Sequence, residues 1–523
     1  MKEFNVTGTC VPSKHYMVDI VSKLEKIKEM VAKEKYFTIN RGRQFGKTTT
    51  LSQLRRFLAD EYVVVSISFE GLGETAFESE EEFCFVFIQQ IYERLAFSSV
   101  TEEYRKGWND ISVKTFKGLS RLITKMCKEK KVVLLVDEVD KASNHVIFMN
   151  FLSKLRDKYL ARADELDYTF HSVILAGVYD IKNLKFKMIQ DGNRAPKIRE
   201  TTVYNSPWNI AADFKVDMSF DITEIQGMLN SFELDAKTGM DTLMMAKEIY
   251  AYTSGYPVLV SQICKNINEE LGNNWTTGGV RHSVKLILNE KSPLFETLIK
   301  NLNANKDLNK LLSHMVLNRT NWSYNPDNEH IDIGLVYGYL KVSEGKVEIA
   351  NRIFETRLLN YFTSKKLDEQ LHQVDNPVVD ETGIIENGKF NMARCLEKFA
   401  QYYERYYNEK DEKFIEREGR MLFLMFLSPV LNGKGFAYIE AQTIEGKRTD
   451  VVINYLDAQY IVELKIWNGQ KKHEDAVCQL LGYMDKFETT EGYLLTFNFN
   501  KNKTSTSEWV DVDEKRRIFN VVI

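Results

Sequence analysis

The sequence of 523 residues predicts an α/β protein built around a parallel sheet, with a helical region and a second α/β domain behind it. Three observations support this fold class. Apolar runs alternate with helical patterns up to about Asn209, helical spacing dominates from Thr223 to about Lys300, and strand and helix patterns alternate again beyond Asp411. Strands separated by helices are joined by crossovers, which makes their sheet parallel. One hydrophobic core does not grow to this length, so several domains are expected.

The first sheet is predicted from four apolar, β-prone runs. They are Tyr36–Ile39, Tyr62–Phe69, Lys131–Asp140 and His171–Tyr179. The nearly continuous hydrophobicity of the later runs is typical of strands buried on both faces. Helical patterns lie between or before them, at about Ile20–Ala32, 79–98 and 114–129. The first domain is therefore expected to be a sheet covered by helices.

Composition sets limits on the class of protein. Hydrophobic residues make up 44% and charged residues 28%, with a net charge of −4, which excludes a strongly basic DNA-coating protein but leaves room for a local basic groove. The six cysteines are scattered without metal-ligand spacing, so free thiols in a reducing compartment are expected. No signal peptide is recognised, and no apolar run approaches the roughly 18 residues of a membrane span. The expectation is a cytoplasmic protein without a membrane partner.

A glycine-containing loop follows the first predicted strand. It carries Gly42 and Gly46, then Lys47 and Thr48, and a helical pattern begins near Leu51. A strand, a glycine loop, Lys-Thr and a helix form the context of a phosphate-binding loop, because glycine lets backbone N–H groups turn toward phosphate oxygens. The residues expected to bind the nucleotide here are Gly42, Arg43, Gln44, Phe45, Gly46, Lys47, Thr48 and Thr49.

Two side chains of this loop have expected roles. Lys47 would reach the β- and γ-phosphates of ATP, and the Thr48 hydroxyl would hold Mg²⁺. One feature is irregular, because the usual pattern wants its first glycine at position 41, where this chain has Arg41, with Gly42 one place late. An ordinary strand–turn–helix is therefore the alternative interpretation of the loop taken alone.

Acidic residues end the third predicted strand. The run Lys131–Asp140 contains Asp137 and Glu138 directly after five apolar residues. Ligands bind at the carboxyl ends of strands in open α/β sheets. Asp137 would hold Mg²⁺ through water, and Glu138 would polarise the attacking water. The alternative is that the pair only caps the next helix.

Three further features surround the predicted nucleotide site. Tyr179 and Asp180 end the fourth strand, where a phosphate sensor or a plain turn is expected. The N-terminal arm carries Tyr16 and its neighbours, which could either cover the adenine or pack the arm onto the sheet. Gly255-Tyr256-Pro257 interrupts two helices in the helical region.

The remaining boundaries follow from pattern changes. Residues 305–362 predict small helices and a hairpin at Leu340–Ala350, whose turn Glu344-Gly345 would be the wing of a winged-helix-like module. A polar stretch near Asp368–Gly388 predicts a linker. The predicted divisions are an ATPase-type core with its arm (1–215), a helical lid (216–300), the winged-helix-like module (301–365), the linker (366–390) and a C-terminal α/β domain (391–523).

The first half of the chain resembles a known family. Arg41 to Thr50, Val133 to Asp140 and Gly255 to Pro257 together resemble AAA-like P-loop ATPases of the STAND and origin-recognition type. In those proteins a Gly-x-Pro turn of the helical lid meets the adenine. The resemblance implies Pro257 as a nucleotide contact, and ATP and Mg²⁺ as cofactors.

A second chemical centre is predicted in the C-terminal domain. Glu463 and Lys465 lie two residues apart in an apolar strand, so both side chains point to one face. Charged groups inside such a strand must be paired or bind a metal. Asp450 can reach the same place if its strand forms a hairpin with theirs. Such a set could bind Mg²⁺ and a scissile phosphate, although Glu-x-Lys triplets also arise by coincidence.

The order helix, three strands, helix, strand, together with Asp450 and Glu463-Leu464-Lys465, resembles the PD-(D/E)XK nuclease superfamily. The resemblance implies a first acid on the helix at Glu418, with Glu416 as the alternative register. It also implies Gln479, paired with Tyr483, on the following helix. Glu418, Asp450 and Glu463 would then be the metal ligands. A degenerate, inactive fold remains open.

Over nearly its whole length the chain resembles bacterial AAA-like ATPases fused to PD-(D/E)XK domains, in which Arg41 follows a common variant of the loop. This implies an ATP-hydrolysing protein with a Mg²⁺-dependent nuclease acting on nucleic acid, with DNA as the expected substrate. Two alternatives stay open. One is a STAND-like switch whose C-terminal domain binds nucleic acid or protein without cutting, and the other is a purely structural interaction protein. A homo-oligomer or a regulatory protein partner is compatible with the sequence.

Overall fold

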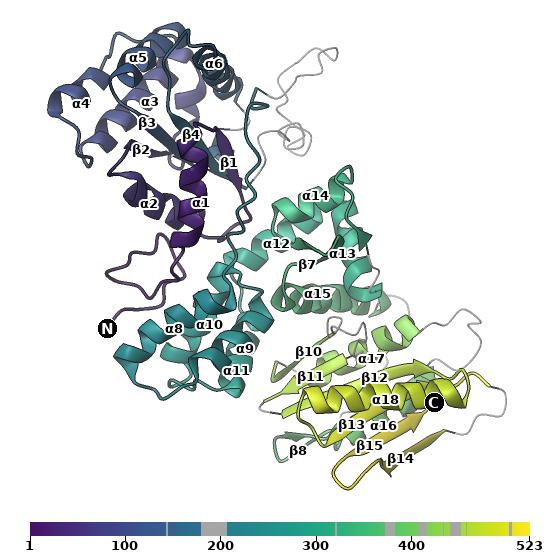
Figure 1. Ribbon diagram of the computed structural model, residues 1–523. Helices are drawn as coiled ribbons and strands as arrows, with labels where there is room; N and C mark the ends of the chain where they lie inside the picture. Colours follow the sequence, from purple (N-terminus) through teal and green to yellow (C-terminus); the bar gives the residue numbers. More distant parts are fainter. Residues whose placement is uncertain are drawn as a thin grey trace, which may run out of the picture. The chain divides into compact units, whose positions relative to one another are not determined.

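The computed structural model describes ten stretches of the chain. They are residues 1–142, 145–178, 207–318, 322–371, 382–406, 416–431, 433–439, 451–456, 458–500 and 505–523. The chain forms two compact units (Figure 1). Unit 1 comprises Met1–Tyr250, Gly255–Lys265 and Pro326–Leu340, and unit 2 comprises Ala251–Ser254, Asn266–Asn325 and Lys341–Ile523. Each unit has its own sheet and is described by itself.

Unit 1 contains a four-stranded parallel sheet in the order β1-β4-β3-β2. Its strands are β1 (Phe37–Asn40), β2 (Val63–Ser68), β3 (Val132–Asp137) and β4 (Ser172–Gly177). Every residue of β3 and β4 is buried, since these strands lie in the middle of the sheet with helices on both faces. The predicted α/β fold with a parallel sheet is confirmed.

Helices cover both faces of this sheet. They are α1 (Val21–Ala32), α2 (Lys47–Leu58), α3 (Glu80–Leu95), α4 (Glu102–Trp108), α5 (Phe116–Glu129) and α6 (Val146–Ala163), with short 3₁₀ turns η1 (Glu74–Phe77) and η2 (Val139–Lys141). Leu134 and Val136 of β3 join the core formed with α3, α5 and α6. The alternate residues Val133 and Leu135 point to the other face, where α2 packs. The sequence did not predict α4 or α6.

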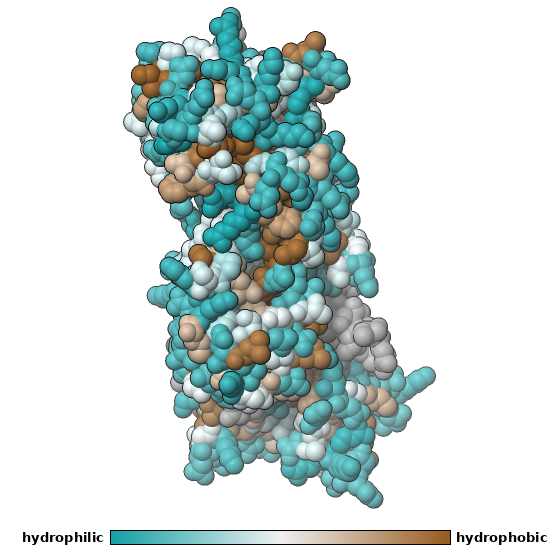
Figure 2. Space-filling view, turned by 60° about the vertical axis from the view of Figure 1, so that its left-hand side comes forward, coloured by the Kyte–Doolittle hydropathy of each residue, from teal (hydrophilic) through white to brown (hydrophobic). Residues whose placement is uncertain are grey.

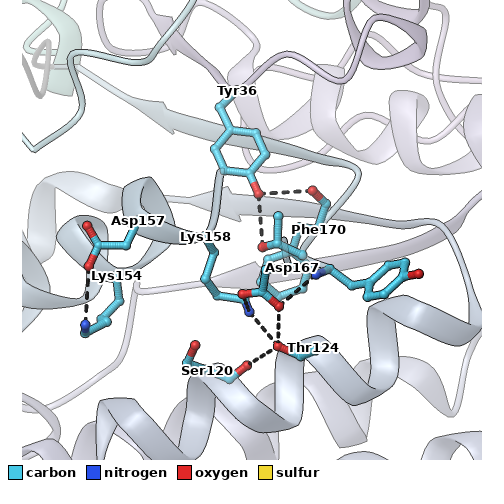
Figure 3. Close-up of polar contacts among 10 residues, drawn as sticks. Tyr36, Ser120, Thr124, Lys154, Asp157, Lys158, Asp167 and Phe170 are labelled. Carbon is cyan, nitrogen blue, oxygen red and sulfur yellow. Dashed lines mark hydrogen bonds and ion pairs between the residues drawn. The ribbon is translucent and has the colours of Figure 1, made fainter. Parts of the chain in front are cut away.

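A buried polar network closes the amino-terminal edge of the sheet (Figure 3). Tyr36, just before β1, donates its hydroxyl hydrogen to the Phe170 carbonyl at 3.0 Å, just before β4. The Lys158 ammonium, whose side chain is 3% exposed, lies 2.6 Å from an Asp167 carboxylate oxygen and donates to Thr124 Oγ1. Burial raises the pKa of the Tyr36 hydroxyl. This edge therefore stabilises the fold, and the opposite edge is left for the phosphate loop.

Within the described part of unit 1 four further helices follow, two of which continue into unit 2. They are α8 (Ile222–Ala236), α9 (Thr242–Thr253), α10 (Pro257–Glu269) and α14 (Glu329–Val336). The predicted break at Gly255 separates α9 from α10, and a Cβ there would lie 1.9 Å from the Phe220 carbonyl oxygen. The N-terminal arm packs on this helical part, because Tyr16 is buried against Phe4 and against Phe232 of α8.

The first part of unit 2 is helical with a small sheet. Its helices are α11 (Thr277–Asn289), α12 (Pro293–Ala304), α13 (Lys306–Asn318) and α15 (Arg352–Leu371), and its sheet has the order β5-β7-β6 from β5 (Trp322–Ser323), β6 (Leu340–Ser343) and β7 (Lys346–Ile349). Glu344 and Gly345 have φ angles of 50° and 75°. Positive φ at both central residues is the signature of a tight hairpin turn. The predicted hairpin is present, and the winged-helix-like module stays a prediction.

A six-stranded mixed sheet forms the C-terminal part of unit 2, in the order β10-β11-β12-β13-β15-β14. Its elements are β8 (Ile385–Glu386), β9 (Lys389–Phe390), α16 (Met392–Tyr406), α17 (Glu416–Leu431), β10 (Gly435–Tyr438), β11 (Val451–Tyr455), β12 (Ala458–Ile466), α18 (Gln470–Lys486), β13 (Glu491–Phe497), β14 (Thr506–Asp511) and β15 (Arg517–Val522), with β8 and β9 as a separate hairpin. The pairs β12–β13 and β13–β15 are parallel, whereas the other pairs of the large sheet are antiparallel.

Both faces of this sheet are covered. On one face, α18 packs through Leu480 onto Leu494 of β13. On the other face, Phe497 contacts Phe399 and Tyr403 of α16. The order α17, β10, β11, β12, α18, β13 follows the predicted order of elements. The strands β14 and β15 and the helix α16 were not predicted.

The surface and the thiols agree with the composition. The face shown in Figure 2 is mostly hydrophilic, with separate hydrophobic patches among the polar residues. Within the part of the chain that the structure describes, no helix combines the length and the hydrophobicity needed to span a bilayer. The six cysteines are free thiols, as expected.

Candidate functional site

The loop between β1 and α2 encloses the Lys47 ammonium. Gln44 and Gly46 adopt positive φ angles of 57° and 76°, which curl the backbone before the helix begins at Lys47. Lys47 is 9% exposed, and its Nζ donates hydrogen bonds to the carbonyls of Arg41 at 2.9 Å and Gly42 at 3.0 Å. The loop's own carbonyls therefore hold the ammonium where a phosphate bound by the loop would meet it.

An oxygen pair suited to Mg²⁺ lies beside this lysine. Thr48 Oγ1 on α2 donates to Asp137 Oδ2 at the end of β3, with a distance of 2.7 Å. The other carboxylate oxygen of Asp137 accepts from the Glu138 N–H at 2.9 Å. Hydroxyl and carboxylate oxygens are the ligands that Mg²⁺ prefers. The side chains predicted to hold Mg²⁺ fit that ion.

Acidic groups surround the lysine and shift its ionisation. Burial lowers the pKa of Lys47, while the carboxylates of Asp140, Glu138 and Asp137 oppose that shift. Burial, followed by the Asp137 charge, raises the pKa of Glu138. Glu138 has a φ of 53°, which is uncommon for a residue with a side chain. A carboxyl group with a raised pKa at a strained strand end is suited to accept a proton.

Asp140 is a functional candidate that the sequence interpretation missed. Its Oδ2 accepts a hydrogen bond from the Val178 N–H at 2.6 Å, so it ties the end of β3 to the end of β4. A Cβ on Gly177 would lie 2.9 Å from Asp140 Oδ1, so this close approach requires glycine. A third acid after Asp137 and Glu138 was the signal that could have identified it. Tyr179 and Asp180, the predicted sensor position, lie outside the described residues.

The helical part of unit 1, the predicted lid, reaches the loop through the predicted Gly-Tyr-Pro turn. A Cβ on Gly46 would lie 3.9 Å from the Pro257 Cβ, which places this proline beside the loop. Tyr256 donates its hydroxyl hydrogen to the Arg43 carbonyl at 2.6 Å, and its ring meets the Phe45 ring at 4.8 Å. The turn was predicted to contact the nucleotide, whereas the tyrosine contact with the loop backbone was missed.

The irregular start of the loop, with Arg41 followed by Gly42, has a structural explanation at each of these two residues. The Arg41 guanidinium donates to the Val216 carbonyl at 2.8 Å and lies over the Phe214 ring at 5.5 Å, and burial lowers its pKa. A Cβ on Gly42 would lie only 2.4 Å from the Tyr337 carbonyl oxygen, in the turn after α14. Arg41 therefore ties the loop to the chain beyond the sheet, and the following residue must be glycine.

The last predicted loop residue contacts the N-terminal arm. Thr49 Oγ1 accepts a hydrogen bond from the Cys10 N–H at 3.1 Å. Burial raises the pKa of the Cys10 thiol, so this cysteine stays a neutral neighbour of the loop. The arm thus fixes the outer side of the first turn of α2.

In unit 2 the predicted Glu463 and Lys465 form an ion pair. Glu463 is 0% exposed, and Lys465 Nζ lies 2.9 Å from its Oε1. β11 and β12 pair antiparallel, with Val451 opposite Val462, so the hairpin required by the prediction is present. Asp450 lies outside the described residues, directly before Val451.

The other predicted nuclease residues lie on the two covering helices. Glu418 is half-buried on α17. Its neighbour Gly419 packs closely on the Phe497 ring, because a Cβ on Gly419 would lie 2.3 Å from a ring atom. Gln479 and the buried Tyr483 lie on α18, which covers the face that Glu463 points to. Glu416 is the first residue of α17. Among the residues that the structure describes, no three His, Cys, Asp or Glu side chains converge as a metal site.

The fold and the loop of unit 1 define a domain of the P-loop ATPase class. Residues 9–355 match the protein family described as "AAA-like domain", and the chain belongs to this family. The match confirms the AAA-like part of the prediction. Since it ends at residue 355, the C-terminal domain must be argued from its own residues. No match was found among curated proteins.

Solved structures of archaeal ATPases and ORC proteins are similar to this chain. The Walker-type ATPase of Pyrococcus abyssi shares 12% identity over 68% of this chain and 99% of its own, with a TM-score of 0.46. The Aeropyrum pernix ORC2 protein with ADPNP and ADP shares 12% identity over 69% and 98%, with a TM-score of 0.36. The Aeropyrum pernix ORC1 protein in complex with DNA shares 11% identity over 67% and 94%, with a TM-score of 0.29.

Proposed function

We propose that this protein binds and hydrolyses ATP with Mg²⁺ in its AAA-like domain, and that its C-terminal domain is a Mg²⁺-dependent nuclease acting on DNA in the cytoplasm. The observation that carries the proposal is the presence of two lysine–carboxylate centres in one chain. One is Lys47 beside Thr48 and Asp137, and the other is the buried pair of Glu463 and Lys465.

In the first centre each group has a separate task. Lys47 neutralises charge on the β- and γ-phosphates, and Thr48 and Asp137 supply oxygens to the metal. Bound Mg²⁺ would neutralise the charge that develops on the transferred phosphate. Glu138 orients the attacking water and accepts its proton, which its raised pKa favours. Pro257 and Tyr256 hold the loop from the lid side.

In the second centre the buried carboxylate and the lysine divide the work. Glu463, with Asp450 and Glu418, would supply oxygens to Mg²⁺, and the ion would supply activation of water and neutralisation of charge on the scissile phosphate. Lys465 would stabilise negative charge on the scissile phosphate, and Gln479 would orient it. A fully buried, ion-paired acid in the middle of an apolar strand supports this assignment, because charge is rarely buried without a partner or a metal. The resemblance to the nuclease superfamily supports DNA as the substrate.

Two variants separate the two activities. Pure protein is incubated with linear and supercoiled DNA, Mg²⁺ or Mn²⁺, and ATP, while phosphate release and DNA cleavage are followed in parallel. Lys47→Ala should abolish ATP turnover, and Asp450→Asn should abolish cleavage while leaving ATP turnover intact. Glu508→Gln, which changes an exposed acid on β14, is the matched control and should cleave normally. The absence of cleavage of any DNA or RNA by the wild-type protein would overturn the nuclease assignment.

A second candidate function is a STAND-like switch, in which ATP holds a conformation that exposes a surface for nucleic acid or a regulatory protein. The contacts of the loop with Tyr256 and with the turn at Tyr337 favour it, because a change in loop conformation on nucleotide binding would reach both segments. This function predicts slow hydrolysis, a tightly retained nucleotide and no effect of Asp450→Ala on cellular activity. Measuring turnover, retained nucleotide and cellular activity of both variants distinguishes the two functions.

A further inference from the structure

The sheet face under α18 changes from apolar to polar toward the carboxyl ends of three neighbouring parallel strands, β12, β13 and β15. On each strand an apolar residue of this face is followed two positions later by a polar residue on the same face. The apolar residues are Ile461, Leu494 and Ile518, and the polar residues are Glu463, Thr496 and Asn520. In the register Glu463 and Asn520 lie on either side of Leu494, and Thr496 lies two residues further along β13, level with Lys465.

Thr496 is the unexplained member of these three polar residues. It is 1% exposed, and its Oγ1 has no hydrogen-bond partner in the described part of the chain. The same holds for Asn520 Oδ1, and for Nδ1 of His473 in the first turn of α18. His473 lies three and seven residues before Ala476 and Leu480, which face the sheet, so it belongs to the same side of the helix. Buried polar atoms without partners cost free energy, and their retention on one face of the sheet needs an explanation.

The neighbour of Thr496 on the next strand is Lys465. The two residues are register partners in the parallel pair of β12 and β13, whose backbones lie about 4.8 Å apart, and their side chains point to the same face. The Lys465 ammonium lies 2.9 Å from Glu463 Oε1, so a cation bound by this carboxylate would meet it there. A divalent cation and an ammonium would repel each other at one carboxylate, which would favour movement of the lysine away from Glu463.

We propose that Thr496 is a positioning residue of this centre: its hydroxyl accepts a hydrogen bond from the Lys465 ammonium when a divalent cation takes the Glu463 carboxylate. The inference rests on the proposed nuclease site and deepens it. Without the hydroxyl, the displaced ammonium loses the hydrogen-bond acceptor that stands beside it in the register. The hydrogen bond to Thr496 thus lowers the free-energy cost of metal binding. It also keeps Lys465 at the place where a scissile phosphate would lie.

The test is Thr496→Val in the full chain, which removes the hydroxyl and keeps the shape. Mn²⁺ is titrated while the unfolding temperature and the rate of DNA cleavage are recorded. We expect the metal-free protein to be as stable as the wild type or more stable, because a buried hydroxyl without a partner is removed. The Mn²⁺ concentration for half-maximal effect should rise about tenfold, and cleavage at saturating metal should fall about tenfold. Thr496→Ser should restore both quantities.

Thr363→Val is the matched control. Thr363 is a buried threonine on α15 whose Oγ1 donates to the Leu359 carbonyl at 2.8 Å, so its loss should lower the unfolding temperature and leave the Mn²⁺ dependence unchanged. Wild-type metal dependence in Thr496→Val would overturn the inference, and so would a metal-free loss of stability equal to that of the control with no metal effect. If the wild type itself shows neither a Mn²⁺-linked shift nor cleavage, the proposed nuclease function fails and takes the inference with it.

Discussion

The two lysines of the candidate centres are held in different ways. Lys47 donates to backbone carbonyls of its own loop, while the carboxylates of Asp137 and Glu138 surround it without taking its ammonium directly. Lys465 instead lies directly on a carboxylate, that of the fully buried Glu463. The Lys47 ammonium is therefore held by backbone carbonyls, with the acids around it as neighbours. The Lys465 ammonium is instead the counter-charge of Glu463.

This difference determines what each centre can tolerate. In the loop, lysine and acids can act on one phosphate and one metal ion at the same time, because neither has to release the other. In the C-terminal domain, a metal ion at Glu463 would meet the ammonium that already lies there, and the two positive charges would repel each other. The charged groups of the loop are thus in place before a nucleotide binds. In the second centre, Lys465 and Glu463 are paired with each other.

The largest expected effect is on ATP turnover. Lys47→Met should reduce phosphate release about a hundredfold or more, since it removes a charge that stabilises the transferred phosphate. The unfolding temperature should stay close to that of the wild type, because a buried ammonium also loses its desolvation cost. Lys26→Met, on the exposed face of α1, is the control. Turnover above a tenth of the wild-type rate would show that the loop does not act through this lysine.

The next largest effect is on the free energy of unfolding, and it tests the ion pair of Lys465 and Glu463. Lys465→Met should lower the free energy of unfolding by about 3 kcal/mol, because it leaves the Glu463 carboxylate buried without its counter-charge. Adding Glu463→Gln to it should recover most of the loss. Urea unfolding of the two single variants and the double variant gives the coupling energy. Simply additive effects would mean that the ion pair is not the reason for the burial.

A backbone contact beside the first lysine gives a smaller effect. Gly42→Ala should lower the free energy of unfolding by about 2 kcal/mol, because its Cβ would overlap the Tyr337 carbonyl and overpacking must be relieved by a backbone shift. Gly73→Ala is the matched control, since its φ is −68° and a Cβ there meets nothing closer than 3.5 Å. Equal stability of the two variants, measured by thermal unfolding, would contradict the contact.

The smallest effect concerns pH. The folded state raises the pKa of Glu138 above its ordinary value, so ionisation of this carboxyl opposes folding at neutral pH. Glu138→Gln should therefore raise the free energy of unfolding at pH 7 by about 0.5 kcal/mol, a small value because the half-buried group is screened by solvent. The advantage should shrink as the pH falls through the raised pKa and vanish below about 4, where the wild-type carboxyl is neutral in both states. Unfolding midpoints between pH 4 and 7 measure this.

Sequence patterns were informative wherever function depends on adjacent residues. Gly46-Lys47-Thr48 and Asp137-Glu138 could be placed because strand ends in a parallel sheet meet at one edge, and Glu463 with Lys465 because a strand repeats every two residues. The rule that buried charge needs a partner or a metal left both outcomes open for these two residues, and the structure shows an ion pair.

The contacts that the patterns missed are made between distant segments. Tyr256 at the Arg43 carbonyl, Asp140 at Val178, and the Tyr337 turn at Gly42 have no local signal, because each depends on how helices and strands pack. Thr496 was missed for a related reason. A threonine in a strand is ordinary until the register shows which lysine stands beside it.

The close approach of Gly42 to the Tyr337 carbonyl gives the sequence of this loop a diagnostic value. A related chain with glycine at position 41 and a side chain at position 42 could not accommodate the turn after α14 in this place. Position 42 and the turn after α14 should therefore change together during divergence, although they lie far apart in the chain. In any set of relatives, the place of the first glycine would identify the members in which that turn docks on the loop.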